Sequence, residues 1–158
     1  MIHKMREMGA SITEGEDFLI MEKRGRVSNT AIKTMPYPGF PTDMQAQFMA
    51  LMTIGRGTGI INETVFENRF MHAAELNRMG ADIKVEGRCA IVKGVRQLTG
   101  TSVKATDLRA GAALIISALA AEGKTEIGEI EYIDRGYFHI EDKLCKIGAR
   151  IERIAYED

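Results

Sequence analysis

The sequence predicts an α+β domain built from repeated helix–strand–helix–strand–strand units, with the helices inside and the sheets outside. Three observations support this prediction. One stretch recurs along the chain, a second recurring stretch alternates with the first, and the long helix expected in each copy of the second is apolar on nearly every side. Because a helix that is apolar all round has to be buried, the neighbouring strands are expected to form sheets around it.

The first recurring stretch occurs at residues 5–21, 76–92 and 144–154. In each copy a short amphipathic helix is expected to end at a glycine, which readily adopts the left-handed conformation that follows many helices. A strand containing an isoleucine comes next, and in the first two copies a turn leads to a second strand. The glycines are Gly9, Gly80 and Gly148, and the isoleucines are Ile12, Ile83 and Ile151.

The second recurring stretch occurs at residues 42–70 and 106–137. Both copies begin with Thr-Asp, continue as an apolar helix, stop at a glycine, enter a strand that carries a glutamate, and reach an arginine before the next helix. A short strand at 102–105 is expected to lead into the later copy. These patterns predict buried, parallel helices over 43–54 and 107–121.

The repeats divide the chain into a partial first unit at 1–33, a second unit at 34–100 and a third at 101–158, all within one partial domain. The first unit begins at its second helix and has no Thr-Asp helix before it. We therefore expect the chain to be the C-terminal part of a longer protein. We also expect an open sheet edge near residues 1–33, and self-association through it, since unpaired edges recruit partners.

The composition is that of a globular protein, with 45% hydrophobic and 27% charged residues. Because 21 basic residues balance 22 acidic ones, the charge gives no reason to expect a nucleic-acid or membrane partner. Cys89 and Cys145 lack the spacing of a metal or redox site, which favours a reduced, cytoplasmic chain. No metal or cofactor is expected, because the three histidines fall at expected helix-surface positions without ligand spacing: His3, His72 and His139.

Two aspartates have two possible roles. Asp43 and Asp107 each follow a threonine at the start of an expected helix, where either residue of the pair could be the N-cap. Alternatively, a carboxylate at such a corner could accept a proton from a substrate hydroxyl. Asp43 also follows all three prolines of the chain, in PYPGFP (36–41), so its corner should be stiff. The residue types alone favour the caps.

Three arginines occupy equivalent places near expected helix starts, where a cation opposes the helix dipole. They could form an anion pocket together with free backbone N–H groups. They could instead pair with neighbouring acids. Recurrence favours the anion pocket. The arginines are Arg69, Arg109 and Arg135, and the possible acid partners are Glu67 for the first and Glu131 or Asp134 for the last.

Four stretches carry a family resemblance: PYPGFPTDMQAQ, ETVFENRFMHAAELNRMGA, ATDLRAGAALI and IDRGYFHIEDKL. Together they resemble the C-terminal part of the UDP-N-acetylglucosamine 1-carboxyvinyltransferase family, over essentially the whole chain. They resemble the sister family of aromatic amino acid synthesis far less. The resemblance implies transfer of the enolpyruvyl group of phosphoenolpyruvate to the 3-hydroxyl of UDP-N-acetylglucosamine, the first committed step of peptidoglycan synthesis. It also implies two inside-out barrels of three units each, with the active site between them.

The resemblance also implies roles for particular residues. Asp43 corresponds to the family's sugar ligand and general base. Asp107 corresponds to an aspartate close to the reacting enolpyruvyl group. The remaining positions that match substrate-binding residues are Val65, through its backbone, and Arg69, Arg109 and Arg135.

The chain matches only about the last third of the family's length, and the family's catalytic cysteine loop lies outside the match. Neither Cys89 nor Cys145 has the context of that loop. The expected partners are therefore the two substrates and the N-terminal part of the enzyme, and the chain alone is expected to be inactive. Two alternatives stay open: a non-catalytic nucleotide-sugar-binding or interaction module, or a sister enolpyruvyl transferase with another acceptor.

Overall fold

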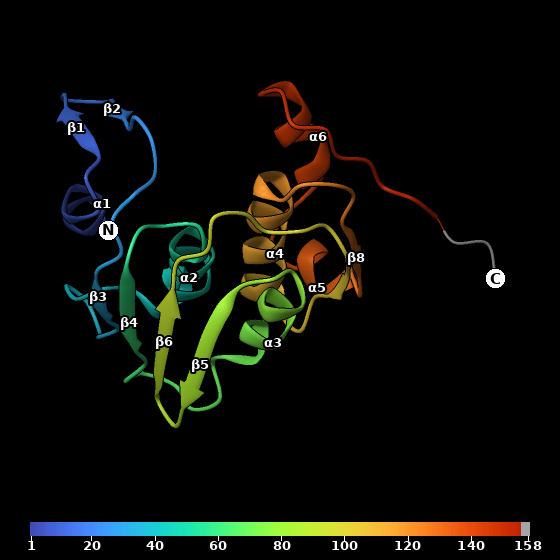
Figure 1. Ribbon diagram of the computed structural model, residues 1–158. Helices are drawn as coiled ribbons and strands as arrows, with labels where there is room; N and C mark the ends of the chain where they lie inside the picture. Colours follow the sequence, from blue (N-terminus) through green and yellow to red (C-terminus); the bar gives the residue numbers. More distant parts are fainter. Residues whose placement is uncertain (156–158) are drawn as a thin grey trace.

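The computed structural model describes residues 1–155 and has a mixed α+β fold, as the sequence predicts (Figure 1). The strands are β1 (Ser11–Glu14), β2 (Leu19–Glu22), β3 (Ala31–Lys33), β4 (Thr58–Asn62), β5 (Asp82–Glu86), β6 (Cys89–Lys93), β7 (Ser102–Lys104) and β8 (Glu126–Gly128). The helices are α1 (Ile2–Glu7), the 3₁₀ turn η1 (Thr42–Met44), α2 (Gln45–Thr53), α3 (Met71–Arg78), α4 (Leu108–Ala120), α5 (Glu131–Asp134) and α6 (Ile140–Lys146).

The strands form one four-stranded sheet and two pairs. The sheet has the order β3-β4-β6-β5, in which β3 and β4 are parallel and the other neighbours antiparallel. The pairs are the antiparallel hairpin β1–β2 and the parallel pair β7–β8. The repeat is visible in this arrangement, because β1–β2 reproduces β5–β6 and β7–β8 reproduces β3–β4. Among residues 1–155, only the central unit contains both halves in one sheet.

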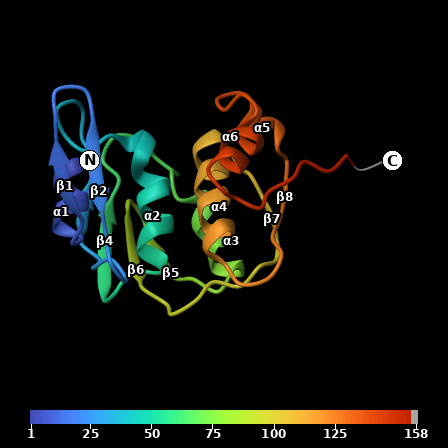
Figure 2. The same cartoon turned by 90° about the horizontal axis from the view of Figure 1, so that it is seen from above.

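Helices α2 and α4 lie side by side between the four-stranded sheet and β7–β8 (Figure 2). Eight of the nine residues of α2 are buried, as its apolar circumference predicts. The two helices meet through small side chains, since Ala46, Ala50 and Ala113 form a buried cluster of their own. Their first turns line one cavity, so both helices begin at the same end of the pair.

The helix ends at glycine are confirmed. Gly9, Gly80 and Gly148 each lie one residue beyond the C-cap of α1, α3 or α6 and have φ angles of 92°, 89° and 97°. A side chain is strained in this left-handed region, which is why the same residue recurs at the same point of each unit. The second strands expected in the first two copies are also present, as β2 and β6.

Three features differ from the sequence-based expectations. Residues 150–154 form no strand around Ile151, because no strand lies beside them within residues 1–155. A short helix, α5, precedes Arg135 and was not expected. The second half of α4 leaves Ile116 and Leu119 43% and 45% exposed.

The described strands do not close a barrel, because β2 and β8 each pair with only one other described strand.

The contact between α2 and α4 generates a stability prediction. Ala113 is fully buried between the two helices, so Ala113→Leu should force them apart and lower the free energy of unfolding by about 1–3 kcal/mol. Ile116→Leu on the exposed side of the same helix is the control and should change it by less than about 0.5 kcal/mol. Urea unfolding measures both, and equal effects would contradict the packing described here.

Candidate active site

The first turns of α2 and α4 enclose a small polar cavity of about 10 Å³, about the space of one water molecule. Its walls come from three segments of the chain that are far apart in sequence. Two predicted arginines and one predicted aspartate meet there. The lining residues are Thr42, Gln45, Ala46, Arg69, His72, Asp107, Arg109 and Ala110.

Asp43 reaches the cavity through an ion pair. The Arg109 side chain donates from Nε to Oδ1 of Asp43. The Asp43 side chain is 63% exposed and the Arg109 side chain 29% exposed, so the pair lies at the open rim. No side-chain cap stabilises η1 or α2. The cap interpretation is therefore wrong for Asp43, because its carboxylate turns toward α4 instead of its own helix.

Asp107 behaves differently from Asp43. Its Oδ1 accepts hydrogen bonds from the backbone N–H groups of Arg109 and Ala110, at 2.8 and 3.0 Å. Asp107 is thus the N-cap of α4, and the cap interpretation is correct here. The cap directs the N-terminal turn of α4 toward the cavity, with Arg109 on that turn.

A buried carboxylate supports the corner that carries Asp43. Glu63 is 1% exposed and accepts hydrogen bonds from the hydroxyls of Thr34 and Thr42 at 2.7 and 2.9 Å. It also accepts from the backbone N–H groups of Val65 and Phe66. Burial raises the pKa of Glu63, but these hydrogen bonds outweigh it and lower the pKa overall. Glu63 therefore ties the residue before Asp43 to the turn that contains Val65.

This network limits what Val65 can offer a ligand. Its N–H already donates to Oε1 of Glu63 at 2.9 Å. Its carbonyl accepts no hydrogen bond from any residue between 1 and 155. A backbone contact from Val65 would consequently be made by the carbonyl oxygen.

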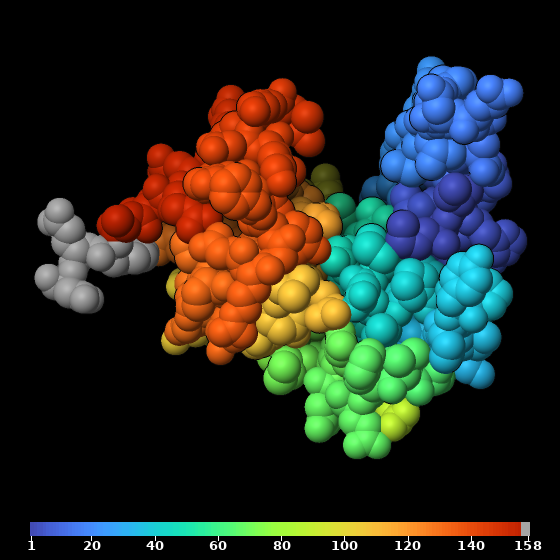
Figure 3. Space-filling model, turned by 180° about the vertical axis from the view of Figure 1, so that it is seen from behind, coloured from blue at the N-terminus to red at the C-terminus, as the bar shows by residue number. Residues whose placement is uncertain are grey.

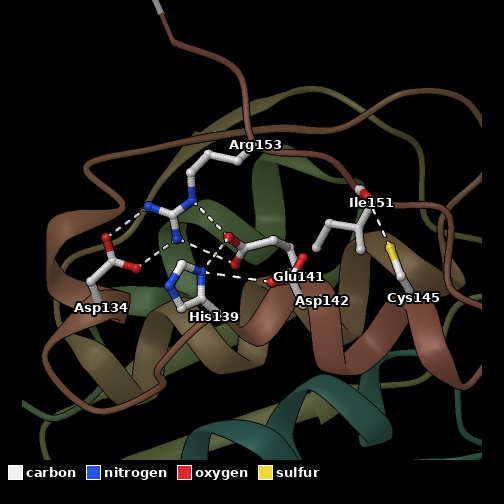
Figure 4. A network of polar contacts seen from close by, with 7 residues as sticks. All are labelled: Asp134, His139, Glu141, Asp142, Cys145, Ile151 and Arg153. Atoms are coloured by element: carbon white, nitrogen blue, oxygen red, sulfur yellow. Dashed lines mark hydrogen bonds and ion pairs between the residues drawn. The ribbon is translucent and has the colours of Figure 1, made fainter.

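The arginines do not pair with the acids expected from the sequence. Glu67 pairs with Arg88 at 2.7 Å. Asp134 pairs with Arg153 at 2.7 Å, and Arg153 also contacts Glu141 (Figure 4). The guanidinium carbon of Arg69 instead lies 4.3 Å from the centre of the Phe66 ring, and that of Arg135 lies 5.2 Å from the centre of the Tyr132 ring.

Arg135 does not line the cavity, but its helix packs on the start of α4. Ile133 of α5 lies so close to Gly111 that a Cβ there would approach Ile133 Cγ1 to 2.3 Å. A Cβ at Gly136 would come within 3.1 Å of Leu108. Arg135 is therefore held beside the N-terminal turn of α4, on an exposed face.

His72 contradicts its expected place on a helix surface. It is 2% exposed, its Nε2 has no hydrogen-bond partner among residues 1–155, and it lines the cavity. Burial lowers the pKa of His72 to about 4, although the nearby Asp107 carboxylate opposes this effect. The spacing could have shown it, because His72 and Leu76 lie on one face of a helix and both are buried in α3.

Residues 1–155 contain no group of three His, Cys, Asp or Glu side chains that could hold a metal ion. The same part of the chain has no helix that is long and apolar enough to cross a membrane.

The buried histidine predicts a pH dependence of stability. Between pH 6.5 and 4 the unfolded chain binds a proton at His72 that the folded chain does not, so stability should fall as the pH falls through this range. At about 1.4 kcal/mol for each unit of pKa, the full loss is roughly 3 kcal/mol. Thermal unfolding between pH 7 and 5 should show the decline, and His72→Gln should reduce it. The same slope in both proteins would contradict the assignment.

Several known proteins resemble this chain in sequence. A family model described as EPSP synthase (3-phosphoshikimate 1-carboxyvinyltransferase) matches residues 1–144. UDP-N-acetylglucosamine 1-carboxyvinyltransferase 1 of Clostridium acetobutylicum is 56% identical over 154 residues, which are 98% of this chain and 37% of that protein. A UDP-N-acetylglucosamine 1-carboxyvinyltransferase of Desulfofundulus thermocisternus is 56% identical over 158 residues, 100% of this chain and 65% of that protein.

Solved structures share the fold. The enolpyruvyl transferase NikO from Streptomyces tendae superposes with a TM-score of 0.85 at 29% identity, over 94% of this chain and 35% of that one. EPSP synthase from Acinetobacter baumannii superposes with a TM-score of 0.71 at 16% identity, over 97% of this chain and 36% of that one. This chain thus spans little more than a third of most of these proteins. Because the family model matches most of its residues, the chain belongs to the EPSP synthase family of enolpyruvyl transferases.

Proposed function

We propose that this chain supplies one wall of the active site of an enzyme that transfers the enolpyruvyl group of phosphoenolpyruvate to the 3-hydroxyl of UDP-N-acetylglucosamine, in peptidoglycan synthesis. The observation that carries the proposal is the meeting of Asp43 with Arg109 at the rim of two helix N-termini. The 56% identity to UDP-N-acetylglucosamine 1-carboxyvinyltransferases supports this choice of acceptor.

Asp43 is proposed to act as sugar ligand and general base. The ion pair uses Oδ1, and Oδ2 receives no hydrogen bond from the described residues, so Oδ2 can accept one from the 3-hydroxyl. As the sugar oxygen bonds to C2 of phosphoenolpyruvate, its proton passes to Asp43, while C3 gains a proton from a group outside these residues. Loss of phosphate from C2 and of a proton from C3 then regenerates the double bond in the product.

The arginines are proposed to hold the anionic groups. Helix N-termini attract anions, and guanidinium groups bind phosphate and carboxylate in a bidentate manner. The guanidinium carbons of Arg69 and Arg135 lie over aromatic rings, and their N–H groups are proposed to bind the ligand. Arg109, which lies beside Asp107, is proposed to attract both the Asp43 carboxylate and the reacting group. The carbonyl of Val65 would contact the nucleotide sugar.

The alternative is a module that binds the nucleotide sugar without catalysis. The chain presents one wall of a site, and an enolpyruvyl transfer needs two substrates held in register, a contribution of roughly 7–11 kcal/mol in well-oriented systems. The proposal therefore expects catalysis only when the N-terminal part of the enzyme completes the site. A binding module would gain no activity from that addition.

A complementation assay distinguishes these functions. The purified chain should release no phosphate from phosphoenolpyruvate in the presence of UDP-N-acetylglucosamine. Adding the N-terminal part of a closely similar relative, as a separate polypeptide, should restore phosphate release. Turnover by the chain alone would contradict the expected inactivity. Failure to restore turnover, although a gel filtration column shows that the two polypeptides bind each other, would contradict the enzymatic proposal.

Substitutions in the reconstituted enzyme test the assigned roles. Asp43→Ala should lower kcat by roughly 10²–10⁴-fold, the usual contribution of a general base, whereas Asp82→Ala on the exposed face of β5 should leave kcat unchanged. Arg135→Ala should mainly raise the KM for phosphoenolpyruvate, and Arg56→Ala serves as its control. Near-normal kinetics of Asp43→Ala would show that its carboxylate has only a structural role.

A further inference from the structure

One guanidinium group joins three C-terminal elements of this chain. Arg153, in the segment after α6, donates from Nη1 and Nη2 to the two carboxylate oxygens of Asp134, at 2.9 and 2.7 Å. It also donates from Nε and Nη2 to Glu141 on the first turn of α6, at 2.9 and 3.3 Å. Asp134 is the last residue of α5. Arg153 therefore ties the end of α5 to α6 and to the segment that follows (Figure 4).

The contact between Arg153 and Asp134 has the geometry of a strong ion pair. Two N–H groups of one guanidinium bind the two oxygens of one carboxylate, which is the bidentate arrangement. The hydrogen bonds from Arg153 lower the pKa of Asp134 and of Glu141, so both carboxylates are charged near neutral pH. The described residues from α5 onward form one projection of the molecule, coloured orange to red in Figure 3.

The carboxylate that Arg153 binds is also the acid nearest to Arg135 in sequence. Arg135 directly follows Asp134, is exposed, and forms no ion pair with any acid among residues 1–155. Neighbouring residues lie well within the distance of about 10 Å over which exposed charges still interact at 0.1 M salt. If Asp134 had no partner, its carboxylate would therefore compete with a bound anion for the guanidinium of Arg135.

We propose that Arg153 is a positioning residue for substrate binding, because it holds the Asp134 carboxylate and so leaves the Arg135 guanidinium available to phosphoenolpyruvate. This inference rests on the proposed role of Arg135 in binding that substrate. Arg153 acts through Asp134 and does not line the cavity between the first turns of α2 and α4.

The two ways of breaking this ion pair should have unequal effects in the reconstituted enzyme. Arg153→Gln leaves a charged carboxylate beside Arg135. It should raise the KM for phosphoenolpyruvate roughly two- to fivefold, the range of an exposed charge pair, and leave kcat nearly unchanged. Asp134→Asn breaks the same ion pair but leaves no carboxylate, so this KM should stay close to that of the unchanged protein. A tie with a merely structural role would give both variants the same KM.

A double variant and two controls assign the effect to one carboxylate. Arg153→Gln with Asp134→Asn should restore the KM, although Glu141 still lacks its arginine there. Arg153→Gln with Asp142→Asn, at a side chain on α6 that is 69% exposed, should not restore it. Arg150→Gln is the matched control for Arg153→Gln. Arg150 is exposed in the same segment and forms no ion pair among residues 1–155, so the KM should not change.

NMR of the ¹⁵N-labelled chain gives a measurement that needs no reconstitution. In Arg153→Gln, the Nε–H signal of Arg135 should move downfield as Asp134 becomes its partner, and the double variant should reverse this shift. An unchanged signal would overturn the proposal. Equal KM values for Arg153→Gln and Asp134→Asn would also overturn it. If Arg135→Ala leaves the KM for phosphoenolpyruvate unchanged, the proposed function of Arg135 is wrong, whereas the NMR result still decides whether Arg153 keeps Asp134 from Arg135.

Discussion

The close approach of α2 to α4 is the constraint on which the candidate site depends. Alanines at positions 46, 50 and 113 let the two helices touch along their first two turns. This contact places two helix N-termini at one end of the pair and brings Arg109 within reach of Asp43. Larger side chains at these three positions would separate the helices and break the ion pair between Arg109 and Asp43. No residue that is proposed to contact a substrate would be changed. The geometry of the site therefore depends first on how the two helices pack, because this packing positions the charged residues.

A second interaction, made by buried Glu63, fixes the position of the proline-rich corner that carries Asp43. Glu63 is an ionisable group in the core, and its four hydrogen bonds compensate for the loss of hydration. Since these bonds come from three separate segments, the proline-rich corner, the end of β3 and the turn at Val65 hold one geometry. Within this frame, buried His72 stays neutral near pH 7 and adds no positive charge beside Arg69 and Arg109.

The sequence correctly predicted the features that depend on local patterns of residues. The repeat, the two buried helices and the glycine ends follow from periodicity and backbone conformation, so they could be found without a structure. The different structural roles of Asp43 and Asp107 could not be predicted, because the partner of Asp43 lies on another helix. The same holds for Arg69 and Arg135, whose aromatic partners replaced the acids that stood nearest in sequence. A strand at Ile151 was predicted wrongly, since a strand needs a neighbour as well as a suitable sequence.

The central claim is that the first turns of α2 and α4 form the ligand-facing end of this chain. The most direct measurement is an NMR titration of the ¹⁵N-labelled chain with UDP-N-acetylglucosamine and phosphate at millimolar concentrations. The account predicts that amide shifts concentrate at residues 42–46, 63–69 and 107–110, with little change in the β1–β2 hairpin or in α6. Shifts centred on the hollow beside β8, or none at the two helix starts, would contradict it.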